Sequence, residues 1–572
     1  MQKIALSTFF ICMITVLFGQ VELRYLENRT LTYQEVIEAY RAMDSQFENA
    51  LLLEFGPTDS GRPLHVFCMS SDKLNSEGNP KEWRKDKTVL LVNNGIHPGE
   101  SCDIDASIAF ARQMLQQGVP DDVLIAIIPV YNIGGALNRG CCSRANQEGP
   151  EEHGFRGNTR NLDLNRDFIK ADALNTLSFY AIFHQFNPHV FIDTHTSNGA
   201  DYQYTMTLIS TQKDKLNPVL ATYLTQKLEP ALYDNMEKRD WPVIPYVNVF
   251  GGTPDKGYAA FLETPRYASG YTALFNTLGF ITETHMLKPY KDRVESTLAF
   301  LHVMTSYMDK NAEDLKQCKK SAEAHDQKLT SMDIQWELDS SQSHKMAFKG
   351  FKASYIPSKV TTGTRLKYDR SSPVDLEINY YDSYKSIDAV SIPEYYVVPA
   401  AWHRVPQLLQ YNGVKMKPLK SDTILRVESE YITHFDFAAS PYEGHFPLQT
   451  LQTERRIQQR VFRKGDYLVP ADQPARRFIV SVLEPTAADS YLRWNFYDEI
   501  FQQKEHFSAY VFEDTAEQLL KDEPELRTKY EEWLKSGGGE DQDPYRQLNY
   551  IYQHSEAYEK EHLRYPVARL IN

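Results

Sequence analysis

The sequence has few cysteines: six in 572 residues, one of them among the first twenty. The other five are too few and too irregularly spaced for a disulfide framework, and none has the CxxC spacing of a structural zinc knuckle. We expect strain to disfavour a bridge between the adjacent Cys141 and Cys142. The odd number also leaves at least one thiol unpaired. The five are Cys68, Cys102, Cys141, Cys142 and Cys318.

Long apolar runs are missing after residue 20. No later window offers the ~18 uninterrupted apolar residues that a membrane helix needs, so we expect no transmembrane segment. The first twenty residues, "MQKIALSTFFICMITVLFGQ", have one early lysine and then an apolar stretch from Ile4 to Phe18. This is the pattern of a signal peptide. The sequence therefore predicts an exported protein, either periplasmic or extracellular.

Positive charge is in deficit. The chain has 62 Lys and Arg residues against 76 Asp and Glu residues, which gives a net charge of -14. Nucleic-acid phosphates would be repelled by such a surface, so we expect no nucleic-acid partner. Hydrophobic residues make up 42% of the chain, as in ordinary globular proteins. A chain of this length is expected to form more than one hydrophobic core.

Between about residues 32 and 308, short apolar runs alternate with amphipathic stretches. "TVLLVNN", "VLIAIIPVY", "HVFID" and "TLGFITE" are typical of strands buried on both faces. The alternation predicts an α/β domain with a mixed, mainly parallel central sheet flanked by helices. Functional sites in such sheets lie beyond the carboxyl ends of the strands. We place the signal peptide at residues 1–20 and this domain at residues 21–310.

The rest of the chain has a different pattern. Residues 311–330 are highly charged and predict a linker helix. Residues 331–485 contain short β-type segments separated by turn residues, which indicates a β-rich, sandwich-like domain. Residues 486–572 predict a mixed, mainly helical C-terminal region.

His97 and Glu100 stand three positions apart in "NNGIHPGESCD", where an apolar run ends and a helical pattern begins. The Pro-Gly pair between them favours a tight turn that can direct both side chains to one point. His195, in "FIDTHTS", ends another predicted strand. Catalytic zinc usually takes three protein ligands and keeps one position open for water. These three residues are therefore candidate zinc ligands.

With these residues in this order, the chain resembles the zinc carboxypeptidase family. The family includes the pancreatic carboxypeptidases A and B, and the chain is similar to exported bacterial members with an extra C-terminal domain. The resemblance covers roughly residues 32–308, about half of the chain. It implies a zinc carboxypeptidase-like fold for the first domain and one Zn²⁺ per chain, bound by His97, Glu100 and His195.

Two further segments support the resemblance. "RNLDLNRDF" looks like the family's DxNR motif. By resemblance, Asp163 orients the first zinc histidine, and Asn165 and Arg166 bind the terminal carboxylate of the substrate, for which a planar guanidinium is well suited. "LGFITETHML" places a carboxylate inside an apolar run, where a charge is costly. The resemblance makes this residue, Glu283, the general base toward the attacking water.

Two more roles are implied by the family at positions whose spacing differs. The arginine that stabilises the oxyanion can fall on Arg139, Arg144 or Arg156, and we choose Arg144. The family's mobile tyrosine, which contacts the substrate, falls on Tyr267 in "RYASGYTA". Its interval to Glu283 is shorter than in the family, so the preferred terminal residue stays open.

These features predict an exported zinc metallocarboxypeptidase that hydrolyses the C-terminal peptide bond of peptides with a free C-terminal carboxylate. Two hydrolase alternatives stay open: a zinc amidase or deacylase, and a peptidoglycan-tailoring carboxypeptidase. An alternative of another class is a catalytically inactive, peptidase-like binding protein whose function lies in the residues after Ser331. The partner of the C-terminal module is not predicted.

Overall fold

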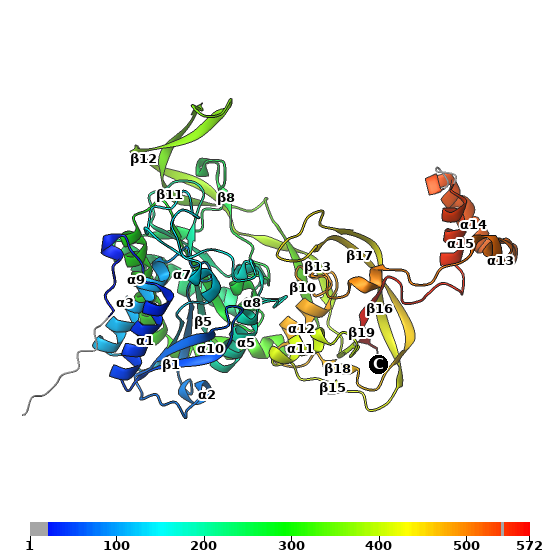
Figure 1. Ribbon diagram of the computed structural model, residues 1–572, viewed down its shortest axis with the longest axis horizontal. Helices are drawn as coiled ribbons and strands as arrows, with labels where there is room; N and C mark the ends of the chain where they lie inside the picture. The colour runs from blue at the N-terminus through cyan, green and yellow to red at the C-terminus, as the bar shows by residue number, and fades with distance from the viewer. Residues whose placement is uncertain (1–20, 539–542, 572) are drawn as a thin grey trace, which may run out of the picture. The chain divides into compact units, whose positions relative to one another are not determined.

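The computed structural model describes residues 21–538 and 543–571 of the chain (Figure 1). The predicted signal peptide, residues 1–20, lies outside the described residues. Contacts divide the chain into two units. The first runs up to Asp326 and includes Trp336–Ser386, and the second consists of Gln327–Gln335 and the chain from Ile387 onward.

The first unit is built on an eight-stranded sheet of order β1-β2-β4-β3-β5-β9-β6-β7. The pairs β3–β4, β3–β5, β5–β9 and β6–β7 are parallel, and the other three pairs are antiparallel. The prediction of a mixed, mainly parallel sheet is therefore confirmed. In sheet order the strands are β1 (Ala50–Pro57), β2 (Pro63–Met69), β4 (Val123–Ile128), β3 (Thr88–Asn93), β5 (Val190–Ser197), β9 (Leu278–His285), β6 (Met206–Ser210) and β7 (Val243–Pro245).

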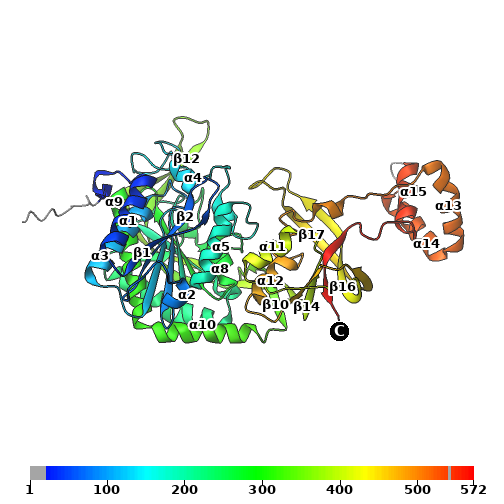
Figure 2. The ribbon, with the colours of Figure 1, turned by 60° about the horizontal axis from the view of Figure 1, so that its bottom comes forward.

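Helices cover both faces of this sheet, which is why its central strands are apolar along their whole length (Figure 2). One face is covered by α1 (Tyr33–Gln46), α3 (Cys102–Gln117) and α9 (Tyr290–Lys310), and the other by α5 (Leu174–Phe186) and α8 (Ala268–Ala273). A capping box between Thr32 and Glu35 fixes the start of α1. The remaining helices of the unit are α2 (Pro80–Trp83), α4 (Ile133–Leu137), α6 (Pro218–Tyr223), α7 (Glu229–Glu237) and α10 (Ala312–Asp326).

A long hairpin of β11 (His344–Pro357) and β12 (Thr364–Tyr381) also belongs to the first unit. Our prediction assigned these residues to the β-rich domain at 331–485. The contacts within the chain assign them to the first unit instead. The end of β12 pairs in parallel with the short β8 (Tyr258–Ala259). Phe348 and Ile378 of the hairpin pack in one apolar cluster with Tyr202. A strand pattern in the sequence does not reveal its partner, which is why this association was missed.

The second unit contains a six-stranded sheet of order β15-β18-β14-β19-β16-β17, in which every pair is antiparallel. The prediction of a β-rich C-terminal module is confirmed in this form. Its strands are β15 (Lys417–Pro418), β18 (Tyr467–Pro470), β14 (Tyr395–Val398), β19 (Arg564–Leu570), β16 (Thr423–Phe437) and β17 (Leu448–Phe462). The helices are α11 (Arg404–Tyr411), α12 (Arg476–Leu483), α13 (Ala509–Asp522), α14 (Pro524–Trp533) and α15 (Pro544–Gln553).

Two further strands, β10 (Ser331–Leu338) and β13 (Tyr384–Ser391), pair with each other, and each runs from one unit into the other. Helices α13, α14 and α15 share an apolar cluster of their own that includes Phe512 and Tyr552. Within the described residues, no helix combines the length and the apolar character needed to cross a bilayer.

Cys141 and Cys142 form a disulfide, contrary to our expectation that strain would disfavour it. The backbone explains the difference. Cys142 has a positive φ of 69°, and the N–H of Ser143 donates to the carbonyl of Cys141 across 2.8 Å. The chain therefore turns sharply at this point, which brings the two sulfur atoms together. The free cysteines among the described residues, Cys68, Cys102 and Cys318, are buried.

Candidate metal and substrate site

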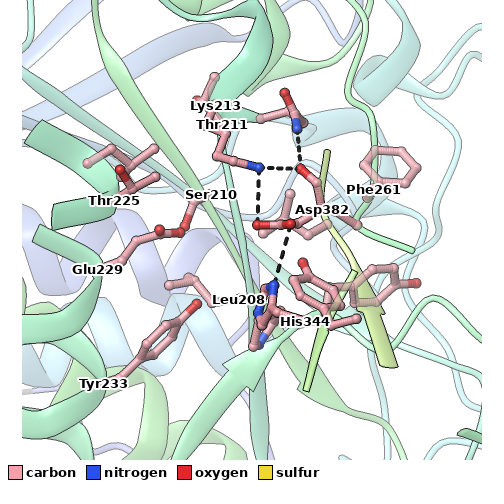
Figure 3. A pocket seen from close by; sticks show the side chains of 17 residues that line it. Leu208, Ser210, Thr211, Lys213, Thr225, Glu229, Tyr233, Phe261, His344 and Asp382 are labelled. Carbon is pink, nitrogen blue, oxygen red and sulfur yellow. Dashed lines mark hydrogen bonds and ion pairs between the residues drawn. The ribbon is translucent and has the colours of Figure 1, made fainter. Parts of the chain in front are cut away.

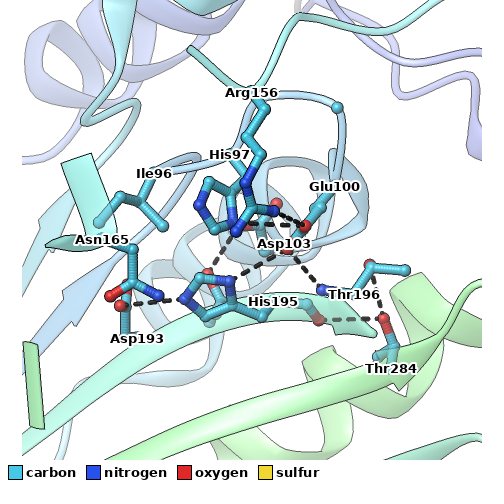
Figure 4. Close-up of polar contacts among 12 residues, drawn as sticks. Ile96, His97, Glu100, Asp103, Arg156, Asn165, Asp193, His195, Thr196 and Thr284 are labelled. Carbon is cyan, nitrogen blue, oxygen red and sulfur yellow. Dashed lines mark hydrogen bonds and ion pairs between the residues drawn. The ribbon is translucent and has the colours of Figure 1, made fainter. Parts of the chain in front are cut away.

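Three buried side chains meet where the central strands end. His97 follows β3, Glu100 lies in the turn before α3, and His195 lies in β5 (Figure 4). Their ligand atoms all lie within 4.8 Å of one another. The N–H of Glu100 donates to the carbonyl of His97 across 2.8 Å, so a tight turn holds the first two together. The fold thus collects the predicted ligands at one point.

Gly99 is required by the packing of this turn. A Cβ at this position would lie 2.7 Å from Cδ of Arg144 and 3.0 Å from the carbonyl oxygen of Gly154. Both separations are too short for a side chain to be added without displacing a neighbour. Glycine therefore lets the turn pack against the loop that carries Arg144.

Each histidine is oriented by an aspartate. Nε2 of His97 lies 2.8 Å from Oδ1 of Asp163, and Nε2 of His195 lies 3.1 Å from Oδ2 of Asp193. A carboxylate at Nε2 favours the tautomer that carries the proton there, which leaves a lone pair on Nδ1. Both Nδ1 atoms face Glu100, at 3.3 Å for His97 and 3.1 Å for His195. The two rings thus present lone pairs to the same place.

Asp193 was not identified from the sequence, although a signal was present. It stands two residues before His195 on the same strand, and alternate residues of a strand share a face. We interpreted it only as part of an apolar run. Asn93 donates to its other oxygen across 2.9 Å and fixes the carboxylate.

The residues present fit a divalent metal ion. Nδ1 of His97 is buried and has no hydrogen-bond partner among the described residues, as expected of an atom that serves as a metal ligand. Two imidazole nitrogens and one carboxylate form a donor set that suits zinc, and three protein ligands are typical of a catalytic rather than a structural site. We conclude that His97, Glu100 and His195 could hold a metal ion.

Glu100 is held in its charged form by its surroundings. Burial acts to raise the pKa of this carboxyl, but Arg144 and His97 together hold that pKa well below its usual range. Nη1 of Arg144 donates to Oε1 across 2.8 Å, and the N–H of Thr196 donates to Oε2 across 2.8 Å. A carboxylate that stays ionised and fixed in place is a suitable metal ligand.

Glu283 lies next to this cluster on β9, in register with His195 on β5. Burial raises the pKa of Glu283 to about 7, an effect that His195 opposes and the negative charge of Glu100 strengthens. Its carboxyl group lines the same pocket as the three metal-ligand candidates, a cavity of about 530 Å³. A carboxyl group with such a pKa can accept and return a proton near neutral pH.

The predicted substrate residues line this pocket as well. Asn165 and Arg166 belong to a short 3-10 turn, Leu164–Arg166, in which the N–H of Asn165 donates to Oδ1 of Asp163 across 3.0 Å. The guanidinium of Arg166 lies 4.5 Å from the centre of the Tyr267 ring, in a cation–π arrangement. Oδ1 of Asn165 is buried with no hydrogen-bond partner among the described residues.

The structure separates the three arginine candidates. Arg139 donates to the carbonyls of Thr30 and Leu31 and does not line the pocket. Arg144 lines it, but its guanidinium is already bonded to Glu100, Gln147 and Thr196. Arg156 also lines the pocket and pairs with Asp163 through Nε and Nη2. Its side chain is 45% exposed, whereas that of Arg144 is 15% exposed.

No family model matches this chain, and no curated protein matches it. Among solved structures, the chain is similar to a metallo-carboxypeptidase from Burkholderia cenocepacia, with 17% identity over 50% of this chain and 71% of that one and a TM-score of 0.35. A metallo-carboxypeptidase from Pseudomonas aeruginosa matches with 13% identity over 51% and 71% of the two chains and a TM-score of 0.37. Bovine thrombin-activatable fibrinolysis inhibitor matches with 12% identity over 50% and 99% and a TM-score of 0.34.

Proposed function

We propose that this protein is a zinc-dependent carboxypeptidase that removes single residues from the C-terminus of peptides. One observation carries the proposal. A buried His97–Glu100–His195 cluster, a carboxyl group with a raised pKa at Glu283, and the guanidinium side chain of Arg166 line one pocket. This combination provides a metal, a base and an anchor for a terminal carboxylate.

Zinc, when bound by the three ligands, would lower the pKa of a water molecule and polarise the scissile carbonyl. Glu283 takes a proton from the attacking water and delivers it to the amine that leaves. A pKa near neutrality serves both steps, because the carboxylate must accept the proton first and release it afterwards. Asp163 and Asp193 keep the histidine rings in one orientation throughout.

Arg166 and Asn165 hold the terminal carboxylate and thereby set where the chain is cut. A guanidinium offers two parallel N–H groups that match the two carboxylate oxygens. The ring of Tyr267 lies against the guanidinium, and this cation–π contact helps to hold the side chain in place. The reaction is then confined to the last peptide bond, because only there does a free carboxylate stand one residue from the scissile carbonyl.

For the oxyanion we propose Arg156 in place of Arg144. The donors of Arg144 already bind Glu100, Gln147 and the carbonyl of Thr196, so its role is to hold the ligand carboxylate. The side chain of Arg156 is more exposed than that of Arg144, and its Nη1 lies 3.6 Å from Oε1 of Glu100, close to the proposed metal. A donor aimed at the place where negative charge develops stabilises the transition state.

The proposal is tested on purified protein that lacks residues 1–20. Metal content and the release of C-terminal residues from a mixed peptide library are measured with and without a chelator. We expect one zinc per chain and stepwise release that stops when the metal is removed. Glu283→Gln is expected to keep the metal and lose turnover by a factor of about 10² or more, because only the base is removed.

Bound zinc without release of any residue would contradict the proposal. Acylated amino acids and cell-wall peptides would then be the next substrates to assay. Export to the periplasm or the outside of the cell is also our proposal, supported only by the signal-like first twenty residues. Its test is the N-terminal sequence of the protein recovered from its native host.

A further inference from the structure

A separate cavity, of about 520 Å³, lies between the β11–β12 hairpin and the loop of residues 248–256. This loop also borders the pocket that contains the metal-ligand candidates. Asn248 and Phe250 line that pocket, whereas Val249 and Gly252 line the separate cavity. At this loop the two spaces are divided by a single chain, whose thickness is about 5 Å. We call the second space the hairpin cavity.

The dividing loop is held in place on both sides. The N–H of Ala200 donates to the carbonyl of Val249 across 3.1 Å, and the hydroxyl of Tyr368 on β12 donates to the carbonyl of Gly252 across 2.8 Å. Gly199, whose φ is 114°, permits the close approach, because a Cβ there would lie 2.9 Å from the carbonyl oxygen of Val249. The loop is therefore tied to the hairpin and to the chain that follows β5.

The hairpin is fixed to the catalytic sheet at its base. Asp382 directly follows β12, and its Oδ2 lies 3.1 Å from Nζ of Lys213 (Figure 3). Nδ1 of His344, the first residue of β11, lies 3.6 Å from Oδ1 of the same aspartate. Phe348 of β11 packs in the apolar cluster that contains Tyr202. The hairpin cavity is thus held at a constant place relative to the metal-ligand candidates.

The lining of the hairpin cavity is mainly apolar but contains one unsatisfied acceptor. Asp201 is only 5% exposed, and its Oδ2 accepts Nε of Arg370 across 2.7 Å. Its Oδ1 is buried without a hydrogen-bond partner among the described residues. A donor from a ligand would remove the cost of this bare acceptor. The apolar lining residues include Phe348, Phe351, Tyr355, Val374 and Leu376.

One strand edge at this cavity is open. The outer edge of β11 is occupied at Gly350, which forms a bridge to Tyr202. Over residues 351–357, no strand of the described chain other than β12 pairs with β11. Phe351 and Ala353 of this stretch line the hairpin cavity. A strand edge with free N–H and C=O groups is completed by an extended peptide, whose backbone adds as a further strand.

We propose that the hairpin cavity binds the part of a peptide substrate that precedes the cleaved bond. The peptide lies extended along residues 351–357 of β11, places an apolar side chain against Phe348 and Leu376, and donates a hydrogen bond to Asp201. The proposal rests on the proposed carboxypeptidase function and names its substrate class: peptides with apolar upstream residues. Since an extended chain spans about 3.3 Å per residue, such a substrate needs about five residues or more to reach from the cleaved bond past the dividing loop.

The hairpin that forms this site lies outside residues 32–308, the part of the chain that resembles the zinc carboxypeptidases. It nevertheless belongs to the same compact unit. Selection by the length of the peptide is therefore a property of the segment that follows the carboxypeptidase-like part, and it can be removed without touching the metal ligands.

The first experiment measures kcat/KM of the zinc-loaded protein on peptides of two, four, six and eight residues that end in the same dipeptide and carry leucine at alternate upstream positions. We expect the value to rise by at least about tenfold with length, because remote contacts contribute to binding of the transition state. Ala353→Phe fills the cavity and should lower the ratio of the eight-residue to the two-residue value by about tenfold. Ser354→Phe adds the same ring at the neighbouring exposed position, outside the lining, and should leave the ratio unchanged.

The second measurement does not depend on turnover. A dye-labelled hexapeptide amide with leucine at alternate positions is titrated into the protein, and binding is followed by fluorescence anisotropy. It has no terminal carboxylate, so Arg166→Ala should not change its affinity. We expect Ala353→Phe to weaken binding by about tenfold or more and Ser354→Phe to leave it unchanged.

The outcomes separate the two proposals. Binding of the amide that Ala353→Phe weakens, without hydrolysis of any peptide, would overturn the proposed function and support the hairpin cavity as a peptide site. Hydrolysis at a rate that does not depend on peptide length would overturn the inference and leave the carboxypeptidase proposal intact. A length dependence that Ala353→Phe does not reduce would also overturn the inference, because the upstream residues would then bind elsewhere.

Discussion

Nη1 of Arg144 donates to Oε1 of Glu100 across 2.8 Å, so the carboxylate among the metal-ligand candidates is fixed by an arginine that lies outside the ligand set. Arg144→Met removes this donor and keeps an apolar side chain of similar length. Loss of a group that orients a metal ligand typically costs about 10- to 100-fold in metal affinity. We expect a zinc dissociation constant that is higher by this factor, measured by competition with a chromogenic chelator.

Arg156→Met is expected to affect catalysis more than zinc binding, in contrast to Arg144→Met. If Arg156 stabilises the oxyanion, its loss should reduce kcat by about 10²- to 10³-fold, with a smaller change in zinc affinity. The two variants are compared in the same chelator and kinetic assays. The reverse pattern, with unchanged zinc affinity and a loss of kcat in Arg144→Met, would return the oxyanion role to Arg144.

Asp193→Asn tests the orientation of the second histidine. An amide at this position can no longer hold the Nε2 proton of His195 as an ionised acceptor does, so zinc affinity should fall by about 10- to 100-fold. Asp121→Asn, at an exposed position of the same unit, is the control and should not change it. Equal affinities in the two variants would show that Asp193 does not act on the metal site.

Arg166→Ala should separate substrates by their C-terminal group. A charged hydrogen bond to a carboxylate contributes about 1.5 to 3 kcal/mol, so kcat/KM on peptides with a free carboxylate should fall by about 10- to 100-fold. Peptides with a C-terminal amide should be affected much less. A loss of the same size on both kinds of peptide would argue against recognition of the terminal carboxylate by Arg166.

His189 should make the stability of the protein depend on pH. Its Nδ1 accepts the N–H of Val89 across 3.1 Å, and burial, with smaller effects from Lys319 and Arg84, lowers its pKa to about 3. An unfolded histidine titrates near its ordinary value of about 6.5. Below that pH the unfolded chain binds a proton that the folded chain does not, so the stabilising contribution, complete above pH 6.5, is lost as the pH falls toward 3.

We therefore expect the free energy of unfolding to drop by about 1 to 2 kcal/mol between pH 7.5 and pH 5 through this residue. His189→Asn keeps an acceptor for Val89 and removes the titrating group, so its stability should change less over that range. Urea unfolding of both proteins at the two pH values measures the difference. If the free energy of unfolding changes equally between the two pH values in both proteins, the pH dependence arises from other residues.

Local sequence patterns were enough to predict the central strands and the candidate metal ligands. The central strands are buried on both faces, so their continuous apolar runs revealed them, and the strand ends located His97 and His195. The HxxE and DxNR motifs each span only four residues. Short turns bring the side chains of each motif together in the structure.

Features that depend on distant parts of the chain were not predictable in the same way. The role of Asp193 depends on how the ring of His195 is oriented. The choice between Arg144 and Arg156 depends on which hydrogen-bond acceptors each guanidinium already contacts. The Cys141–Cys142 bridge depends on a backbone conformation that composition does not specify. The partner of the β11–β12 hairpin lies more than eighty residues earlier in the chain, at β8.

That hairpin makes the first unit discontinuous, because the chain leaves it after Asp326, enters the second unit, and returns at Trp336. No single cut can therefore separate the two units. During synthesis, the first unit is incomplete until about residue 386 has emerged, although α10, the last helix of its main body, ends at Asp326. A truncated chain that stops near residue 330 would keep the three metal-ligand candidates but lack Phe348 and Ile378, which pack with Tyr202 and Tyr258. The order of residues along the chain thus ties completion of an apolar cluster of the first unit to the start of the second unit.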